Sequence, residues 1–473
     1  MRRVCTYPSA SQVRYRYGRR ADEYGEAMTL AVAGTLMQTP VPDRLTAVDA
    51  VVEVGAGAVV AVHDRSTGAG AAAGRRALEF ASERVELDAG TFLLPGLVDL
   101  HVHAPQWPQL GTGLDLPLER WLFEYTFPLE ARYADIEFAA AVWDDLVPSL
   151  LTMGTTTAVY HSSNHLEATT ALARACAGHG QRALVGRVAM DHPEGTPEWY
   201  RDTTAAAGVD ASAASIEAIA AEASPLVEPV ITPRFAPACT DALLQGLGEL
   251  AEATGVRVQT HCAESDWHCG YAQERFGSTD PVALDSFGLM RPHTVLAHSD
   301  HLTDDDMALV SGHRAGVAHC PLSNAYFANA VFRVRRALTA GVGVGLGTDI
   351  SGGARPGLLG VCQDAVTVSR MLEDGVDPAL APAERGVPDS RIDTVTAFWL
   401  ATAGGAAAVD LPVGLIEPGR RFDAMAVRTD RPGGSIRLWE EFDDDARIFE
   451  KVVRLATADD ISHVWVDGSS VKP

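Results

Sequence analysis

Eight short apolar runs, separated by stretches long enough for helices, organise the middle of the chain between residues 96 and 349. The runs are "GLVDLHVH", "TTTAVYH", "RALVGRVAMD", "PVITPRF", "VRVQTHCAE", "TVLAHSD", "AGVAHCPLSN" and "GVGVGLGTD". The stretches between them include Ala-rich segments with helical spacing, such as "TDALLQGLGELAEATG". Continuous apolar runs that alternate with helices are typical of parallel strands buried on both faces. The sequence therefore predicts an α/β fold, a (β/α)8 barrel of the TIM type.

The two ends of the chain have a different residue pattern, in which short runs rich in β-branched residues alternate with Gly and Asp. Examples are "AVDAVVEVGAGAVVAVHD" near the start and "ISHVWVDGSSV" near the end. We expect an antiparallel sheet in the first part and a small composite β-sandwich domain built from residues 28–90 and 411–473, with the barrel occupying residues 91–410. Residues 1–27 contain six arginines and no secretory signal, so we expect a disordered N-terminal arm.

Composition excludes several classes of partner. The formal net charge of −24 opposes binding to a phosphate backbone, so we expect no nucleic acid and a small-molecule partner instead. The most apolar 18-residue window is interrupted by Asp49 and Glu53, which argues against a membrane-spanning helix. Seven scattered cysteines without a CxxC pair do not resemble a disulfide framework, and they favour a reducing, cytoplasmic environment.

Polar or ionisable residues follow the apolar runs at their C-terminal ends, where barrels of this type place their active sites. The first run ends in His101 and His103, whose period-two spacing directs both side chains to the same face. His261, His298 and Asp349 end later runs. An HxH pair alone is weak evidence for a metal site, but the larger set is difficult to explain as unrelated polar residues.

Three imidazoles and one carboxylate suit Zn²⁺ or Fe²⁺ with a position left for water, which such an ion acidifies. We therefore predict a metal site of His101, His103, His261 and Asp349, and the sequence does not separate zinc from iron. Many barrels hold two metals bridged by a carbamylated lysine after the fourth strand. The only lysines here are Lys451 and Lys472, which leaves a mononuclear site.

Glu264 and His298 are the candidate proton-handling groups beside this site. Glu264 lies three residues after His261, where a carboxylate could move a proton between water and a leaving amine, although a solvated loop glutamate is the alternative. We predict that His298 hydrogen-bonds the water or a developing oxyanion rather than acting as a fourth imidazole ligand. His161 and His165 could line the pocket or lie outside it.

The chain resembles the amidohydrolase superfamily and, within it, the guanine deaminases. The superfamily motifs are "PGLVDLHVH", "THCAE", "AHSDHL" and "GLGTD", and the closer match is "HAPQWPQLGTGLDLPLERWLFEYTFPLEARYAD" with "PRFAPAC" and "AHCPLSN". The resemblance runs from about Leu93 to the C-terminus. It departs from the family pattern at "ARPGLL", with Arg355 and Pro356, and at "AYFANAVF", so the substrate preference could differ.

The resemblance implies zinc-dependent deamination of guanine to xanthine and ammonia by a homodimer. It implies one zinc on the predicted ligands, catalytic roles for Glu264, His298 and Asp349, and purine contacts from Gln106, Arg234, Phe235, Glu264 and His298. Arg234 could instead form a structural ion pair. Two alternatives stay open: deamination of a related aminopurine, pterin or triazine, and a non-catalytic scaffold. The intact candidate ligands argue against the scaffold.

Overall fold

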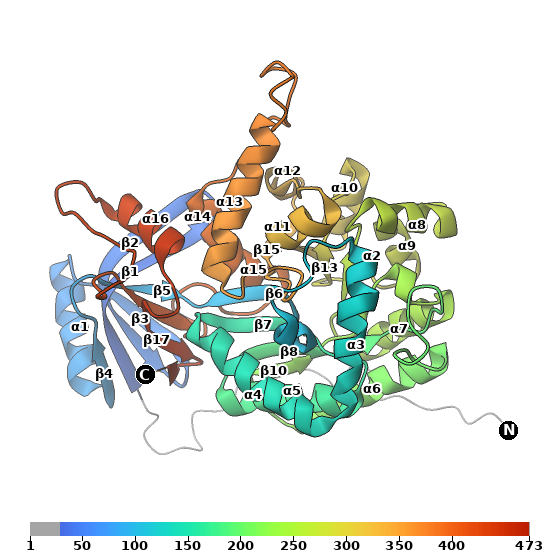
Figure 1. Ribbon diagram of the computed structural model, residues 1–473. Coiled ribbons are helices and arrows are strands. Elements are labelled where there is room, and N and C mark those ends of the chain that lie inside the picture. The colour runs from blue at the N-terminus through green and yellow to red at the C-terminus, as the bar shows by residue number, and fades with distance from the viewer. Residues whose placement is uncertain (1–28, 473) are drawn as a thin grey trace.

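The computed structural model describes residues 29–472, and the arm predicted for residues 1–27 lies outside them. Two β-rich regions lie side by side: a sheet built from the two ends of the described chain, and parallel strands with surrounding helices from its middle (Figure 1). Within residues 29–472, no helix is both long enough and apolar enough to cross a membrane. The six cysteines in this range are free thiols.

Eight strands from both ends of the chain form one sheet. They are β1 (Thr29–Val41), β2 (Arg44–Gly55), β3 (Ala58–Asp64), β4 (Glu83–Glu86), β5 (Thr91–Pro95), β16 (Ala424–Arg428), β17 (Ile461–Val466) and β18 (Ser469–Lys472). The order across the sheet is β18, β17, β16, β5, β1, β2 and β3, and β4 also pairs with β1. The two ends of the chain therefore share one sheet, which also includes β5 from the first residues of the range expected for the barrel.

The antiparallel sheet expected in the first part is only partly correct. Strands β1, β2 and β3 pair antiparallel, but β4 and β5 both run parallel to β1. The parallel pairing requires a crossover, and helix α1 (Gly68–Phe80) lies within it. The Thr67 side chain caps this helix by accepting a hydrogen bond from the backbone N–H of Gly70. This Ala-rich helix was not expected from the sequence, because the runs on both sides of it are rich in β-branched residues.

All eight apolar runs contain parallel strands of the central region. These are β6 (Leu97–His103), β7 (Thr155–His161), β8 (Arg182–Gly186), β9 (Val188–Ala189), β10 (Val227–Pro229), β11 (Thr232–Pro233), β12 (Gln259–Cys262), β13 (Val295–His298), β14 (Gly316–His319) and β15 (Gly343–Leu346). They pair as β10, β8, β7, β6, as β11 with β9, and as β12, β13, β14, β15. Nearly every residue of these strands is buried, as parallel strands covered on both faces require.

Helices follow the strands and cover the parallel sheets (Figure 1). The helices of this region and of the C-terminal part are α4 (Ile136–Thr152), α5 (Leu166–His179), α6 (Ala205–Ala221), α7 (Asp241–Thr254), α8 (Asp266–Phe276), α9 (Asp280–Ser286), α10 (Asp304–Gly312), α12 (Val334–Thr339), α13 (Leu358–Asp374), α14 (Thr394–Trp399), α15 (Gly405–Ala408) and α16 (Asp445–Leu455). Helix α13 and the loop after it project from the rest of the molecule.

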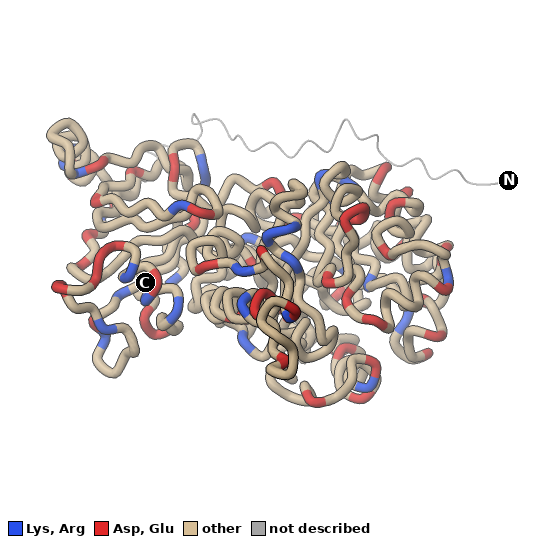
Figure 2. The backbone as a smooth tube through the Cα atoms, turned by 90° about the horizontal axis from the view of Figure 1, so that it is seen from above, with Lys and Arg blue, Asp and Glu red and all other residues tan. Residues whose placement is uncertain are grey.

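Short helical segments cross the C-terminal ends of the parallel strands or connect the longer elements. They are η1 (Ala104–Gln109), α2 (Leu118–Trp121), η2 (Leu122–Thr126), α3 (Phe127–Glu130), η3 (Ala131–Ala134), η4 (Ala236–Ala238), α11 (Pro321–Ser323), η5 (Asn324–Ala328) and η6 (Leu400–Gly404). Acidic and basic positions are interspersed along the chain in the view of Figure 2. The segments after β6 and β14 contribute apolar residues to the pocket described next.

Candidate functional site

The end of β6 carries the two histidines of the HxH pair on one side of the strand. His101 is completely buried and His103 nearly so, since backbone and side chains surround the strand end. Two backbone hydrogen bonds join the segment that follows β15 to this strand. Asp349 N–H donates to the carbonyl of His101 at 2.9 Å, and His103 N–H donates to the carbonyl of Ile350 at 3.0 Å. The carboxylate of Asp349 is thereby placed beside both imidazoles.

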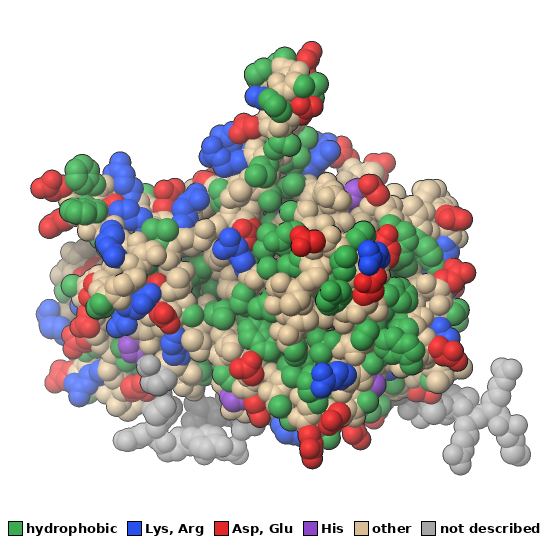
Figure 3. Space-filling view, in the orientation of Figure 1, with side chains coloured by type: hydrophobic (Ala, Val, Ile, Leu, Met, Phe, Trp, Pro, Cys, Tyr) green, Lys and Arg blue, Asp and Glu red, His purple; other side chains and the backbone are tan. Residues whose placement is uncertain are grey.

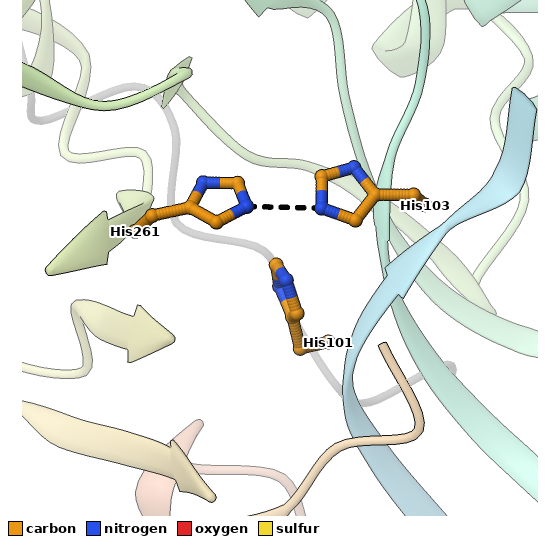
Figure 4. A group of neighbouring side chains, drawn as sticks. All are labelled: His101, His103 and His261. Atoms are coloured by element: carbon orange, nitrogen blue, oxygen red, sulfur yellow. Dashed lines mark hydrogen bonds between the residues drawn. The ribbon is translucent and has the colours of Figure 1, made fainter. Parts of the chain in front are cut away.

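His261 reaches the same point from β12. Its Nδ1 lies 2.6 Å from the carbonyl oxygen of Arg234, an acceptor, so Nδ1 carries the proton and Nε2 presents a lone pair. This Nε2 lies 2.9 Å from Nε2 of His103, and Figure 4 shows the ring of His101 directed toward the gap between them. A backbone carbonyl that fixes the tautomer of a histidine is a common support for metal ligands.

Two overlapping groups of potential ligand atoms meet here, each with its atoms within 4.8 Å of one another. One contains His101, His103 and His261, and the other contains His101, His298 and Asp349. Asp349 Oδ1 lies 3.1 Å from Nε2 of His101 and 3.5 Å from Nε2 of His103. The four predicted ligands therefore come together from three strand ends, and His298 lies next to them.

The electrostatics of this cluster suit a divalent cation. Burial lowers the pKa of His101, His103 and His261, so the imidazoles are neutral as metal ligands must be. Burial alone would raise the pKa of Asp349, but its contacts with His101, with His298 and with the Ser323 hydroxyl together lower it below its ordinary value. Both ring nitrogens of His101 are buried without a hydrogen-bond partner in the described part of the chain. The donor set and the unpartnered nitrogens fit a metal ion such as zinc.

His161, at the end of β7, is a further buried imidazole beside these two groups. Its ring centroid lies 4.7 Å from that of His101, 4.8 Å from that of His103 and 5.0 Å from that of His261. It belongs to neither group of convergent ligand atoms, so it packs against the predicted ligands without joining them. His165 is half-buried and lies beside Tyr200, outside the residues that line the pocket.

Glu264 and His298 face each other next to the cluster, with Nε2 of His298 3.7 Å from Oε1 of Glu264. Burial would lower the pKa of His298, but the nearby carboxylates of Glu264 and Asp349 raise it instead. Nδ1 of His298 lies 2.8 Å from Oδ1 of Asn324, whose Nδ2 donates to Asp300 at 2.6 Å. This arrangement places the proton of a neutral His298 on Nδ1 and turns Nε2 toward Glu264.

A pocket with about 380 Å³ of empty space opens onto these groups. Its apolar walls come from α2 and η2, for which the sequence analysis offered no role, and from η5, which overlaps the stretch "AYFANAVF". The lining residues that carry no predicted role are Leu118, Trp121, Leu122, Ser323, Phe327 and Gly352. The rings of Trp121 and Phe327 lie 5.1 Å apart across this wall. Figure 3 shows apolar side chains gathered near the centre of one face of the molecule.

Gln106, Arg234 and Phe235, the residues expected to contact a substrate, also line the pocket. Gln106 lies on η1, directly after β6, and Arg234 and Phe235 follow β11. All three side chains are buried against the surrounding elements. Every residue of the predicted site except His101 therefore lines one cavity, and His101 lies beside the lining residue Asp349. The roles of these residues stay predictions.

Glu130 is a further buried residue of the site that the sequence analysis did not single out. Its carboxylate accepts hydrogen bonds from Nε2 of Gln106 at 2.9 Å and from Nη1 and Nη2 of Arg234 at 2.5 and 3.1 Å. The ion pair considered for Arg234 is thus present, and the guanidinium lines the pocket as well. Glu130 ends the motif "TFPLE", but no local spacing relates it to a strand end.

The two departures from the family pattern lie in different surroundings. Arg355 is half exposed, with its Nε 3.2 Å from a carboxylate oxygen of Asp364 on α13, and it does not line the pocket. The stretch "AYFANAVF" overlaps η5 and contributes Phe327 to the pocket wall. Only the second departure therefore touches the cavity directly.

Comparison with known proteins agrees with this geometry. The model of the Amidohydrolase family matches residues 92–471, and the chain belongs to this family. Within it, the chain is a member of the guanine deaminase group. It is 35% identical over 452 residues to a probable guanine deaminase of Schizosaccharomyces pombe, covering 93% of this chain and 82% of that protein. It is 34% identical over 395 residues to the guanine deaminase of Dictyostelium discoideum, covering 82% and 84%.

Solved structures give the same assignment of fold. The crystal structure of a guanine deaminase from C. acetobutylicum, with guanine bound in its active site, matches this chain with a TM-score of 0.81 and 27% identity. The match covers 93% of this chain and 99% of that one. A triazine hydrolase matches with a TM-score of 0.77 at 19% identity, which supports the mixed α/β fold alone.

Proposed function

We propose that this protein hydrolyses guanine to xanthine and ammonia. The observation that carries the proposal is the meeting, in one pocket, of the His101, His103, His261 and Asp349 cluster with Gln106 and Arg234. The first group is suited to activating water, and the second offers donors to the oxygen and ring nitrogens of a purine. Similarity to guanine deaminases over most of the chain supports guanine as the substrate.

We further propose that His101, His103, His261 and Asp349 hold one zinc ion, with Fe²⁺ as the alternative. The neutral, buried imidazoles, the ionised Asp349 and the unpartnered nitrogens of His101 support this assignment. A bound divalent ion would supply Lewis acidity toward water at this end of the pocket.

Side chains of the protein then accept and donate the protons of the reaction. Water adds to the amino-bearing ring carbon, so that a C–O bond forms and the C–N bond to the amino group breaks. Both protons come from the attacking water: Glu264 takes one and delivers it to the adjacent ring nitrogen. Asp349 accepts the other from the added hydroxyl, and this proton reaches the leaving amine through Glu264, so that ammonia departs, the ring carbon becomes a carbonyl and both carboxylates are ionised again. His298, whose Nε2 lies 3.7 Å from Glu264, hydrogen-bonds the attacking oxygen.

Gln106, Arg234 and Phe235 bind and orient the purine in this scheme. Gln106 and Arg234 hydrogen-bond its polar edge, Glu264 and His298 contact the reacting side, and Phe235 walls in the ring. The ring of Phe235 lies 6.1 Å from that of His261, which supports a position between the cation site and the mouth of the pocket.

We propose that the parallel strands close into the (β/α)8 barrel of residues 91–410. Apolar side chains from β6, β7, β8, β13 and β14 meet in one buried cluster, as inward-facing residues of a barrel do. The hydrogen bonds between the ends of β6 and β15 and a bridge between Ile231 and Val258 also support closure. For residues 28–90 and 411–473 we propose a β-sandwich, supported by the bridge that brings Ala58 of β3 back to Arg421.

We also propose a cytoplasmic homodimer that acts on a small purine and binds neither nucleic acid nor membranes. The acidic net charge and the free, scattered cysteines support the cytoplasmic, small-molecule part of this proposal. The dimer is an expectation from the family resemblance, and light scattering on the purified protein tests it.

The decisive experiment measures ammonia release from guanine, 2-aminopurine, a pterin and a triazine by purified protein of known metal content. We expect guanine to be the preferred substrate and about one zinc per chain. Glu264→Ala should retain the metal and lose turnover by about 10²-fold or more. Turnover of another heterocycle but not of guanine would refute the substrate, and unchanged activity of Glu264→Ala would refute the role of that carboxylate.

A further inference from the structure

Glu130 is a buried carboxylate behind the pocket that no part of the proposed reaction uses. Its side chain is 1% exposed, on the short helix α3, and it is not among the residues that line the cavity. It nevertheless accepts four hydrogen bonds, two from Arg234, one from Gln106, and one from the hydroxyl of Tyr200 at 3.0 Å. A carboxylate with this many charge-assisted and neutral bonds fixes the groups around it.

The Gln106 amide has only one consistent orientation in this network. Its Nε2 donates to Glu130, which accepts but cannot donate when ionised, and its Oε1 accepts from the backbone N–H of Ser351 at 3.1 Å. If the amide nitrogen and oxygen were exchanged, the amide oxygen would face the Glu130 carboxylate, which is also an acceptor. The amide nitrogen would face the backbone N–H of Ser351, which is also a donor. Glu130 and Ser351 therefore determine where the remaining amide N–H of Gln106 is available.

The Arg234 guanidinium is constrained by the same carboxylate. Both Nη atoms bond to Glu130, and the guanidinium carbon lies 4.9 Å from the centre of the Phe127 ring. Phe127 and Glu130 belong to the same helix, so α3 holds the guanidinium from two directions. Burying a guanidinium charge costs free energy unless the charge is paired and hydrogen-bonded, and Glu130 does both for Arg234.

We propose that Glu130 is a positioning residue that makes Gln106 and Arg234 into fixed hydrogen-bond donors for the ring carbonyl of the purine. This inference rests on the proposed function, because it takes that pocket as the purine site. It predicts that Glu130 contributes to selectivity for bases with a carbonyl, without touching the base. A purely structural role, in which Glu130 only neutralises Arg234, predicts no such selectivity.

The test compares guanine with 2-aminopurine, which carries the amino group but lacks the ring carbonyl. In Glu130→Gln, we expect the KM for guanine to rise on the order of 100-fold with a smaller change in kcat, because the donors lose their alignment. The inhibition constant of 2-aminopurine should change by less than about threefold, since 2-aminopurine has no ring carbonyl to accept from these donors. Glu124→Gln is the matched control, because it makes the same substitution at an exposed position nearby.

Two results would overturn the proposal: an unchanged KM for guanine, or equal weakening of guanine and 2-aminopurine. If Glu130→Gln does not fold, Glu130→Asp keeps the charge and shortens the side chain, and the same selective loss is expected on a smaller scale. Failure of the wild-type protein to release ammonia from guanine would instead refute the proposed function. Calorimetric binding of xanthine and 2-aminopurine to wild type and variant would then decide the role of Glu130 separately.

Discussion

At the scale of single residues, the orientation of His298 depends on a side chain that stands outside the pocket lining. Asn324 accepts from Nδ1 of His298 and donates to Asp300, whose pKa burial raises to about 8. Without Asn324, the imidazole could exchange tautomers and turn a proton rather than a lone pair toward Glu264. The amide therefore defines the protonation pattern at the reacting side of the pocket.

We predict that Asn324→Ala lowers kcat on the order of 10²-fold while the KM for guanine changes little, because the variant misplaces a proton-handling group but keeps the donors. Steady-state kinetics and metal analysis check this, and the metal content should stay at the wild-type level. Asn324→Asp, which keeps an acceptor for Nδ1, should retain more activity than Asn324→Ala. Equal activity of Asn324→Ala and wild type would contradict the assignment.

The sequence could predict those site residues that stand at the ends of strands. His101, His103 and His261 are found this way because β6 and β12 are strong apolar runs whose ends must share one edge. Glu130 and Asn324 could not be found, since each acts through a partner that is distant along the chain. Glu130 meets Arg234 from a separation of 104 residues, which no local pattern encodes.

At the scale of elements, the strands were easier to predict than the segments between them. Parallel strands need unbroken β-branched runs, and all eight runs contain one. Helix α1 was not predicted, because Ala and Gly within a β-rich region carry little periodicity. It lies in the crossover that allows β4 and β5 to run parallel to β1. The segments α2 and η2 form pocket walls by tertiary contacts alone, which is why their role was not visible in the sequence. The third wall segment, η5, was noted only as a departure from the family pattern.

Helix α10, which follows β13 and its terminal His298, begins with a complete capping box. The Thr303 hydroxyl accepts from the backbone N–H of Asp306 at 3.1 Å, and the Asp306 carboxylate accepts from the backbone N–H of Thr303 at 2.9 Å. We predict that Thr303→Ala lowers the free energy of unfolding by about 1 kcal/mol, measured by urea denaturation. Thr303→Ser keeps the hydroxyl and should resemble wild type, and an equally stable Thr303→Ala would show that the cap contributes nothing.

At the scale of the whole molecule, a buried ion pair joins the parallel strands to the sheet of the two termini. Arg182 on β8 donates from Nε and Nη2 to Asp423, which directly precedes β16, at 2.9 and 3.0 Å. Both side chains are at most 2% exposed, and Arg182 also bonds to Asp467 at 3.3 Å, so it is the charge of Asp423 that depends on this pair. Removing Arg182 leaves a buried, uncompensated carboxylate between the two regions.

We predict that Arg182→Gln lowers the free energy of unfolding by about 3 to 5 kcal/mol. Adding Asp423→Asn to that variant should restore part of the loss, because the stranded charge is gone. Arg174→Gln, which breaks an exposed pair with Glu222, should cost less than about 1 kcal/mol. Urea denaturation of the four proteins measures these differences, and similar losses for Arg182→Gln and Arg174→Gln would contradict the prediction.

Strand β5 lies between β1 from the start of the chain and β16 from its end. During synthesis β5 leaves the ribosome early, but the neighbour for its second edge is translated only with the last tenth or so of the protein. Until then the nascent chain carries an apolar edge open to pairing with other chains. Final assembly therefore waits for the C-terminal strands to dock, and chains that stall before them are the ones expected to aggregate.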